Sequence, residues 1–190
     1  MTTAVHKCII FDATKQHKMK KTDLNKSEYN EYYSRYIDKI PNETHLIEGY
    51  INGKNSMIDF INSIPNDKLL YKYLPEKWSI KEVIQHLIDT ERVFMYRCLR
   101  IARNDSTNIE GFEQDEWIIP SEADAKSKAE LIKEFSINRE NSIMLLKSIS
   151  DKNLTFVGTA NGAVMSARAA AFTILGHDMH HTKIIQERYL

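Results

Sequence analysis

Apolar residues recur at helical spacing through most of this chain, and no segment sustains the strict alternation that marks a β-strand. The spacing predicts a short helix that ends at Pro41, because proline cannot continue a helix. It also predicts long amphipathic helices over about residues 44–64, 79–102, 125–149 and 166–189. Helices of that length with polar connections favour an all-α fold, and a four-helix bundle is the natural architecture.

Local signals add detail to one helix start, one helix interior and one connection. Ser79 and Glu82 form the pattern of a capping box, which predicts a helix beginning at residue 80. Gly49 and Gly53 each cost about 1 kcal/mol relative to alanine inside a helix, so they indicate close packing or a bend. Residues 104–123 form a connection long enough to cross the bundle, so a simple up-and-down order is not assured.

The chain divides into two parts by pattern. Residues 1–26 show little periodicity and are expected to form a flexible tail, whereas residues 27–190 are expected to form the bundle domain. Met19 is a second candidate for the natural start of the chain. Cys8 and Cys98, in the tail and in a helix, do not make a disulfide framework. With no secretory segment recognised either, a cytoplasmic location is the default expectation.

Charge and hydropathy argue against two classes of partner. The 26 Lys and Arg residues balance the 26 Asp and Glu residues. Nucleic-acid-binding proteins usually carry a basic surplus, because contacts with phosphates supply most of their affinity. No apolar run approaches the roughly 20 residues that a membrane-spanning helix needs. We therefore expect neither a nucleic-acid partner nor a membrane partner.

Candidate chemistry is concentrated in the last helix. His177 and His181 lie four residues apart, and residues at that spacing share one face of a helix. Two imidazoles stacked in this way can both reach one metal ion at about 2.0–2.1 Å. The structural alternative is a polar helix face at a dimer contact or at a pH-sensitive boundary.

His86 is the candidate for a third ligand. It lies in the helix that begins at residue 80, at the edge of the apolar stripe, so it can point inward between helices. Three neutral imidazoles leave a coordination position open, as catalytic sites do. Taken alone, however, a histidine beside an apolar face is more often a satisfied core or boundary residue than a ligand.

Five further residues are candidates for supporting roles around such a site. His180 can flank the ligand face as a donor or proton shuttle, and Asp178 and Asp89 can orient ligand imidazoles. Trp117 and Glu116, in the long connection, can wall a nearby pocket. Simpler interpretations remain for four of them. His180 is typical of a boundary residue, the two aspartates are typical of a solvated surface, and Trp117 is typical of ordinary packing.

These residues together resemble the DinB/YfiT-like family of metal-binding four-helix bundles. The resemblance covers about residues 28–190 and leaves out the N-terminal tail. The matching pieces are Trp78-Ser79 at a helix start, His86 within Val83-Ile84-Gln85-His86-Leu87, Gly111-Phe112 through Trp117, and His177-Asp178-Met179-His180-His181 followed by Gln186. The joint spacing of one histidine in the second long helix and two in the last is the specific part of the match.

The resemblance implies an up-down-down-up bundle and a divalent metal held by His86, His177 and His181. The metal would be zinc, nickel, iron or manganese, and many members of the family form homodimers. Members of known activity include transferases and isomerases that use a low-molecular-weight thiol such as bacillithiol or mycothiol, and others are assigned as hydrolases. The substrate would accordingly be a small molecule.

Two functions from different classes remain open. The first is a metal-dependent enzyme, a hydrolase or thiol transferase, whose open three-histidine site activates water or a thiol. The second is a non-catalytic bundle in which the histidines serve metal binding, dimerisation or structure. No set of basic residues suited to a thiol cofactor's carboxylates is evident, because Arg92, Arg97 and Arg100 are typical of a solvated helix face.

Overall fold

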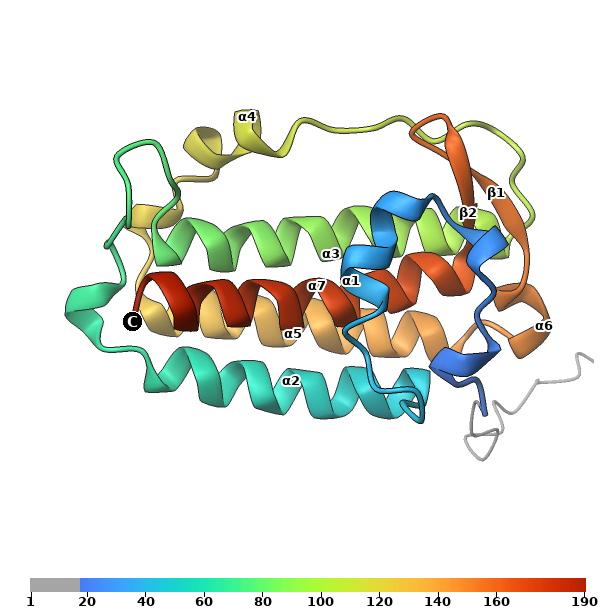
Figure 1. Ribbon diagram of the computed structural model, residues 1–190, viewed down its shortest axis with the longest axis horizontal. Helices are drawn as coiled ribbons and strands as arrows, with labels where there is room; N and C mark the ends of the chain where they lie inside the picture. Colours follow the sequence, from blue (N-terminus) through green and yellow to red (C-terminus); the bar gives the residue numbers. More distant parts are fainter. Residues whose placement is uncertain (1–17) are drawn as a thin grey trace, which may run out of the picture.

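The centre of the computed structural model, which describes residues 18–190, is a bundle of four long helices (Figure 1). Within the bundle, α3 and α5 run in one direction, and α2 and α7 run in the other (Figure 1). The predicted all-α bundle with up-down-down-up topology is confirmed. The four helices are α2 (Leu46–Ser63), α3 (Ile80–Ala102), α5 (Lys128–Lys147) and α7 (Ala167–Arg188).

The long connection between α3 and α5 allows these two helices to be parallel neighbours. It returns along the length of the bundle, so that α5 starts at the same end as α3 (Figure 1). The segment predicted to be irregular contains a short helix and two 3₁₀ turns. These are α4 (Gln114–Ile118), η5 (Ile119–Ser121) and η6 (Ala123–Ala125).

The N-terminal segment of the described chain packs against the start of α2. The side chain of Met19 is buried, and its carbonyl accepts a hydrogen bond from the amide of Leu46 at 2.9 Å. Met19 therefore attaches this segment to α2, a long-range pairing about which local periodicity carries no information, and the flexibility expected of residues 1–26 stays a prediction. The rest of the expected tail, with Cys8, lies outside the described residues. The segment contains η1 (Lys21–Asp23), η2 (Lys26–Glu28), η3 (Glu31–Tyr33) and α1 (Ser34–Ile37).

A two-stranded antiparallel hairpin lies between α5 and α7, and the sequence pattern did not predict it. It consists of β1 (Val157–Ala160) and β2 (Ala163–Ser166), which follow α6 (Asp151–Leu154). Asn161 and Gly162 link the strands with φ angles of 52° and 71°. Such a two-residue turn needs positive φ at both positions, for which Asn-Gly is the favoured pair. Each strand is too short for its alternation to stand out.

Helix α3 begins where the capping box places it. The amide of Glu82 donates to the Ser79 hydroxyl at 3.1 Å, and the amide of Ser79 donates to the Glu82 carboxylate at 2.7 Å. A 3₁₀ turn, η4 (Asn66–Lys68), lies between α2 and the start of α3. Gly49 marks close packing, because a Cβ built there would lie 2.7 Å from the Leu175 side chain. No helix in the described part of the chain is both long and apolar enough for a membrane span.

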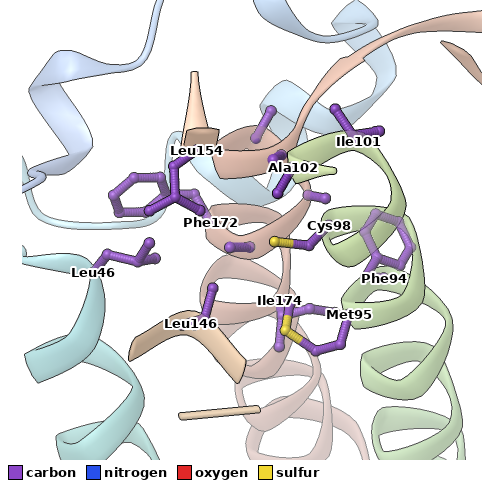
Figure 2. Packing of buried hydrophobic residues seen from close by; sticks show 14 of the residues in the cluster. Leu46, Phe94, Met95, Cys98, Ile101, Ala102, Leu146, Leu154, Phe172 and Ile174 are labelled. Atoms are coloured by element: carbon purple, nitrogen blue, oxygen red, sulfur yellow. The ribbon is translucent and has the colours of Figure 1, made fainter. Parts of the chain in front are cut away.

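The apolar core consists of two clusters at opposite ends of the bundle. The first contains Phe94, Leu146 and Phe172, and Figure 2 shows how their helices meet. The second contains Ile84 and Phe135 with their neighbours on α2 and α7. Between the clusters lie the buried polar side chains His86, Thr90, Glu91, Arg139, His177 and Asp178. The middle of the bundle is therefore a polar layer, and the candidate site lies in it.

Candidate metal centre

The three histidines singled out in the sequence meet inside the bundle. His86 from α3 and His177 from α7 are both only 4% exposed, and their Nε2 atoms lie 3.1 Å apart. His181 follows His177 by one turn, and its ring centre lies 4.5 Å from that of His177. Ligand nitrogens of all three lie within 4.8 Å of one another, and this is the metal-ligand group found among residues 18–190.

The spacing of these nitrogens suits a metal ion. Imidazole nitrogens bind zinc at about 2.0–2.1 Å, so two ligands of a tetrahedral ion lie about 3.3 Å apart. The separation between His86 and His177 is close to that value. Three imidazoles without a carboxylate or a thiolate form a donor set for ions such as zinc, nickel or iron. The residues present therefore fit a divalent metal.

The surroundings keep the three imidazoles neutral, which is the form that binds metal. Burial lowers the pKa of His86 to about 4. Burial, followed by the neighbouring His86 and His180, lowers the pKa of His181 to about 2. Burial also lowers the pKa of His177 well below its ordinary value, and the other histidines add to the effect.

Two neighbours hold the ring of His86. The hydroxyl of Thr90 lies 3.3 Å from its Nδ1, one helical turn further along α3. If Nε2 faces the ion, Nδ1 carries the proton and its N–H donates a hydrogen bond to the Thr90 hydroxyl oxygen. The Trp78 ring packs against the imidazole, with ring centres 4.8 Å apart. Neither role was predicted from the sequence, although the four-residue spacing of His86 and Thr90 places them on one helix face.

His177 is enclosed by the short helix α1. A Cβ at Gly176 would lie 2.1 Å from the carbonyl oxygen of Tyr36, so only glycine allows the backbones of α1 and α7 to approach this closely. The approach brings the Tyr36 ring edge-on to His177, with centres 5.1 Å apart. The Nδ1 atom of His177 is buried and has no hydrogen-bond partner in the described part of the chain. Tyr36 was not a candidate from the sequence, because a contact across 140 residues leaves no local signal.

The two other supporting candidates on these helices lie outside the ligand group. His180 is half-buried, and its ring contacts His181 at 5.1 Å and Tyr36 at 5.3 Å between centres. Its suggested role as a donor or shuttle stays a prediction. Asp89 binds Arg92 at 2.8 Å and Gln85 at 3.1 Å, and it forms no hydrogen bond to a histidine among residues 18–190.

Asp178 takes neither of the roles expected for it. It is buried and accepts a 2.6 Å hydrogen bond from Arg139 on α5, which also binds Glu91 on α3. Adjacent helical residues point about 100° apart, so Asp178 faces α5 while His177 faces α3. Burial raises the pKa of Asp178 to about 6, although Arg139 opposes this shift. Asp178 thus joins α7 to α5 and α3 directly behind the histidines.

A cavity of about 360 Å³ lies beside the histidine cluster. His177, a member of the cluster, and Thr90, the neighbour of His86, both line this cavity. Trp117 and Glu116 are not among the lining residues; Trp117 is 42% exposed and packs on Phe112. The rest of the lining comes from α1 and η3, α3, the long connection, the hairpin and α7, and consists of Asn30, Tyr32, Tyr33, Tyr36, Phe94, Arg97, Phe112, Glu113, Gln114, Asp115, Ala160, Asn161, Ala163 and Thr173.

Arg97 differs from the other arginines of α3. Arg92 and Arg100 are partly exposed and bind Asp89 and Asp105, as a solvated face would. Arg97 is only 2% exposed and lines the cavity, so the interpretation of this residue as solvated is wrong. It lies on the inner face of α3, about three turns from His86, a position that helical spacing alone could have indicated.

Comparison with known proteins places this architecture in a family. The family model of the DinB superfamily matches residues 53–185. A curated protein of Oceanobacillus iheyensis, named "Putative metal-dependent hydrolase OB0413", is 26% identical over 148 residues, which cover 76% of this chain and 82% of that protein.

A solved structure has the same fold. YfiT from Bacillus subtilis, described as "a probable metal-dependent hydrolase with an unusual four-helix bundle topology", matches with a TM-score of 0.66 and 14% identity. The match covers 78% of this chain and 90% of that chain, and at this identity it concerns the fold alone. Because the family model spans more than half of the sequence, the chain belongs to the DinB superfamily.

Proposed function

We propose that this protein is a metal-dependent hydrolase that holds a divalent ion on His86, His177 and His181. The observation that carries the proposal is the convergence of these three neutral imidazoles from two helices, with ligand nitrogens within 4.8 Å of one another. The name of the curated relative supports the hydrolytic reaction. A divalent ion on three imidazoles keeps a coordination position open, lowers the pKa of water and polarises a carbonyl oxygen.

The protein side chains supply orientation and enclosure. The Thr90 hydroxyl holds the direction of the His86 ring, and the rings of Trp78 and Tyr36 restrict the imidazoles of His86 and His177. Restricting the ligands in this way reduces the reorganisation needed when the site acts. The cavity beside His177 gives a small substrate access to the cluster.

The same cavity favours an enzyme over a purely structural bundle. A structural metal site is closed by four protein ligands, whereas no fourth His, Cys, Asp or Glu joins this cluster within the described residues. A polar cavity next to an open cluster is what a catalytic site requires. The thiol-transferase alternative, the identity of the metal and the homodimer stay predictions.

Metal analysis tests the proposal directly. Protein purified without a histidine tag should contain, or take up after treatment with a chelator, a single equivalent of zinc, nickel, iron or manganese. His86→Ala should abolish tight uptake, whereas His180→Ala should retain it, because His180 adjoins the cluster without belonging to it. A folded wild-type protein that takes up none of these metals would contradict the proposal.

An activity screen then separates the two reactions. Loaded protein is assayed on small esters and amides, with and without an added low-molecular-weight thiol. Hydrolysis that depends on the metal but not on the thiol supports the hydrolase. Turnover only in the presence of a thiol, with a thioether product, would favour the transferase.

A further inference from the structure

Arg97 carries a buried charge that no carboxylate of the described residues neutralises. Within residues 18–190 its side chain forms no ion pair, and its Nε atom is buried without a hydrogen-bond partner. The guanidinium hydrogen-bonds to neutral groups, since Nη2 donates a long 3.4 Å hydrogen bond to the carbonyl oxygen of Glu110 and the Tyr33 hydroxyl forms a second hydrogen bond. Burial lowers the pKa of Arg97, and the hydroxyl of Tyr33 beside it opposes the shift. An uncompensated buried cation is costly, so its retention calls for a function.

The surroundings of Arg97 form a receptor for a flat anion. The guanidinium carbon lies 4.8 Å from the ring centre of Phe94 and 5.8 Å from that of Phe112. Aromatic walls hold the planar guanidinium in place, and its N–H groups can bind a carboxylate with two parallel hydrogen bonds. Glu113 and Asp115 also line the cavity, but neither forms an ion pair with Arg97. A single cation suits a monoanionic carboxylate.

One face of α3 connects Arg97 to the histidine cluster. His86, Thr90, Phe94 and Arg97 follow one another at helical spacing, and the last three line the same cavity that His177 borders. Their Cα atoms span about three turns, or roughly 16 Å along the axis. The long Arg97 side chain shortens this span, because helical side chains lean toward the N-terminus.

We propose that the substrate carries a carboxylate, which Arg97 binds while the scissile bond of the same molecule lies at the three histidines. Only the placement of the scissile bond at the three histidines rests on the proposed function. The carboxylate site itself stands on the burial of Arg97 and on its lack of an ion pair among residues 18–190. The protein therefore selects elongated acids, with the charged end at Arg97 and the reacting end at the cluster.

The first experiment uses metal-free protein and is independent of the hydrolase proposal. Phenylacetate and phenylacetamide are titrated into ¹⁵N-labelled protein, and the Nε–H resonance of Arg97 is followed by NMR. We expect saturable shifts with phenylacetate, and an affinity for phenylacetamide that is at least about tenfold weaker. The two probes differ by one ionic hydrogen-bonded pair. Equal binding of the two probes, or no binding of phenylacetate, would overturn the carboxylate site.

Variants assign the effect to the residue. Arg97→Met should lose the preference for phenylacetate, and Arg97→Lys should keep part of it, because lysine retains the charge without the planar fork. Arg100→Met is the matched control on the same helix, since Arg100 is already paired with Asp105 at 2.6 Å. If Arg97→Met unfolds, the wild-type and Arg97→Lys titrations still decide the question. A preference that survives in folded Arg97→Met would contradict the assignment.

The second experiment tests whether one molecule spans both sites. Cobalt-loaded protein is titrated with succinic, adipic and suberic monohydroxamic acids and with the alkyl hydroxamic acids of equal length, and the visible spectrum reports binding at the metal. One carboxylated length should bind at least about tenfold more tightly than its neutral partner, and Arg97→Met should remove that gain. Protein without metal uptake would refute the proposed function alone, whereas bound metal with no gain at any length would refute the spanning substrate.

Discussion

The guanidinium of Arg139 on α5 donates a 2.6 Å hydrogen bond to the carboxylate of Asp178 on α7. The same guanidinium binds Glu91 on α3 at 2.7 Å, and all three side chains are buried. Because Glu91 adjoins Thr90 and Asp178 adjoins His177, this ion network sets how α3 and α7 face each other at the histidine cluster.

Replacing Arg139 should strongly destabilise the protein. Arg139→Met leaves Glu91 and Asp178 buried without a counter-charge, which should lower the free energy of unfolding by about 3–5 kcal/mol. Urea denaturation measures this difference. Arg92→Met is the control, because Arg92 is 47% exposed and its pairs should be worth about 1 kcal/mol or less. Similar losses for the two variants would show that the buried network has no special weight.

Replacing Gly176 should destabilise the protein, because it forces α1 away from α7 beside the histidine cluster. The added Cβ of Gly176→Ala would overlap the Tyr36 carbonyl at 2.1 Å, which should cost about 1–3 kcal/mol despite the better helix propensity of alanine. Gly53→Ala gains the same propensity on α2, and its Cβ would lie 3.3 Å from the end of the Arg139 side chain and 3.9 Å from the Leu175 side chain, with no backbone atom as close. In thermal unfolding, the melting temperature of Gly176→Ala should lie well below that of Gly53→Ala. The reverse order would contradict the close backbone contact.

Removing the Thr90 hydroxyl should weaken metal binding without unfolding the bundle. Thr90→Val leaves Nδ1 of His86 without its partner, and the loss of such a contact typically weakens metal affinity by about 10–100-fold. Thr173→Val is a matched control, because Thr173 lines the same cavity but donates to the carbonyl of Ala169. Competition with a coloured zinc chelator measures both affinities. Unchanged affinity in Thr90→Val would remove Thr90 from the site.

Acid should weaken the attachment of the N-terminal segment to α7. Burial alone would raise the pKa of Glu28, but hydrogen bonds from Arg168 and Ser166 outweigh it and lower the pKa to about 2. A folded pKa below the ordinary value of 4.5 means that the stabilisation is full above pH 4.5 and is lost as the pH falls toward 2. The free energy of unfolding, measured by urea denaturation across this range, should fall less steeply in Glu28→Gln than in wild type.

The metal-ligand candidates were accessible from the sequence because their signals are local. The spacing of His177 and His181 is fixed by one helix, and His86 follows a capping box that sets where α3 begins. Thr90, Phe94 and Arg97 lie at positions that the same helical period assigns to the face of His86. Their roles were missed because periodicity gives a direction on a helix but does not identify the neighbouring element.

What the sequence determined by itself is the set of long helices, most of their ends and the two-helix origin of the histidine cluster. These follow from hydrophobic period, capping and spacing, which act over a few residues. The tertiary structure alone decided that Asp178 pairs with Arg139, that Gly176 admits Tyr36 and that Arg97 is buried beside a cavity. Those facts depend on which helix faces which, and the free energy of packing elements distant in sequence sets that arrangement.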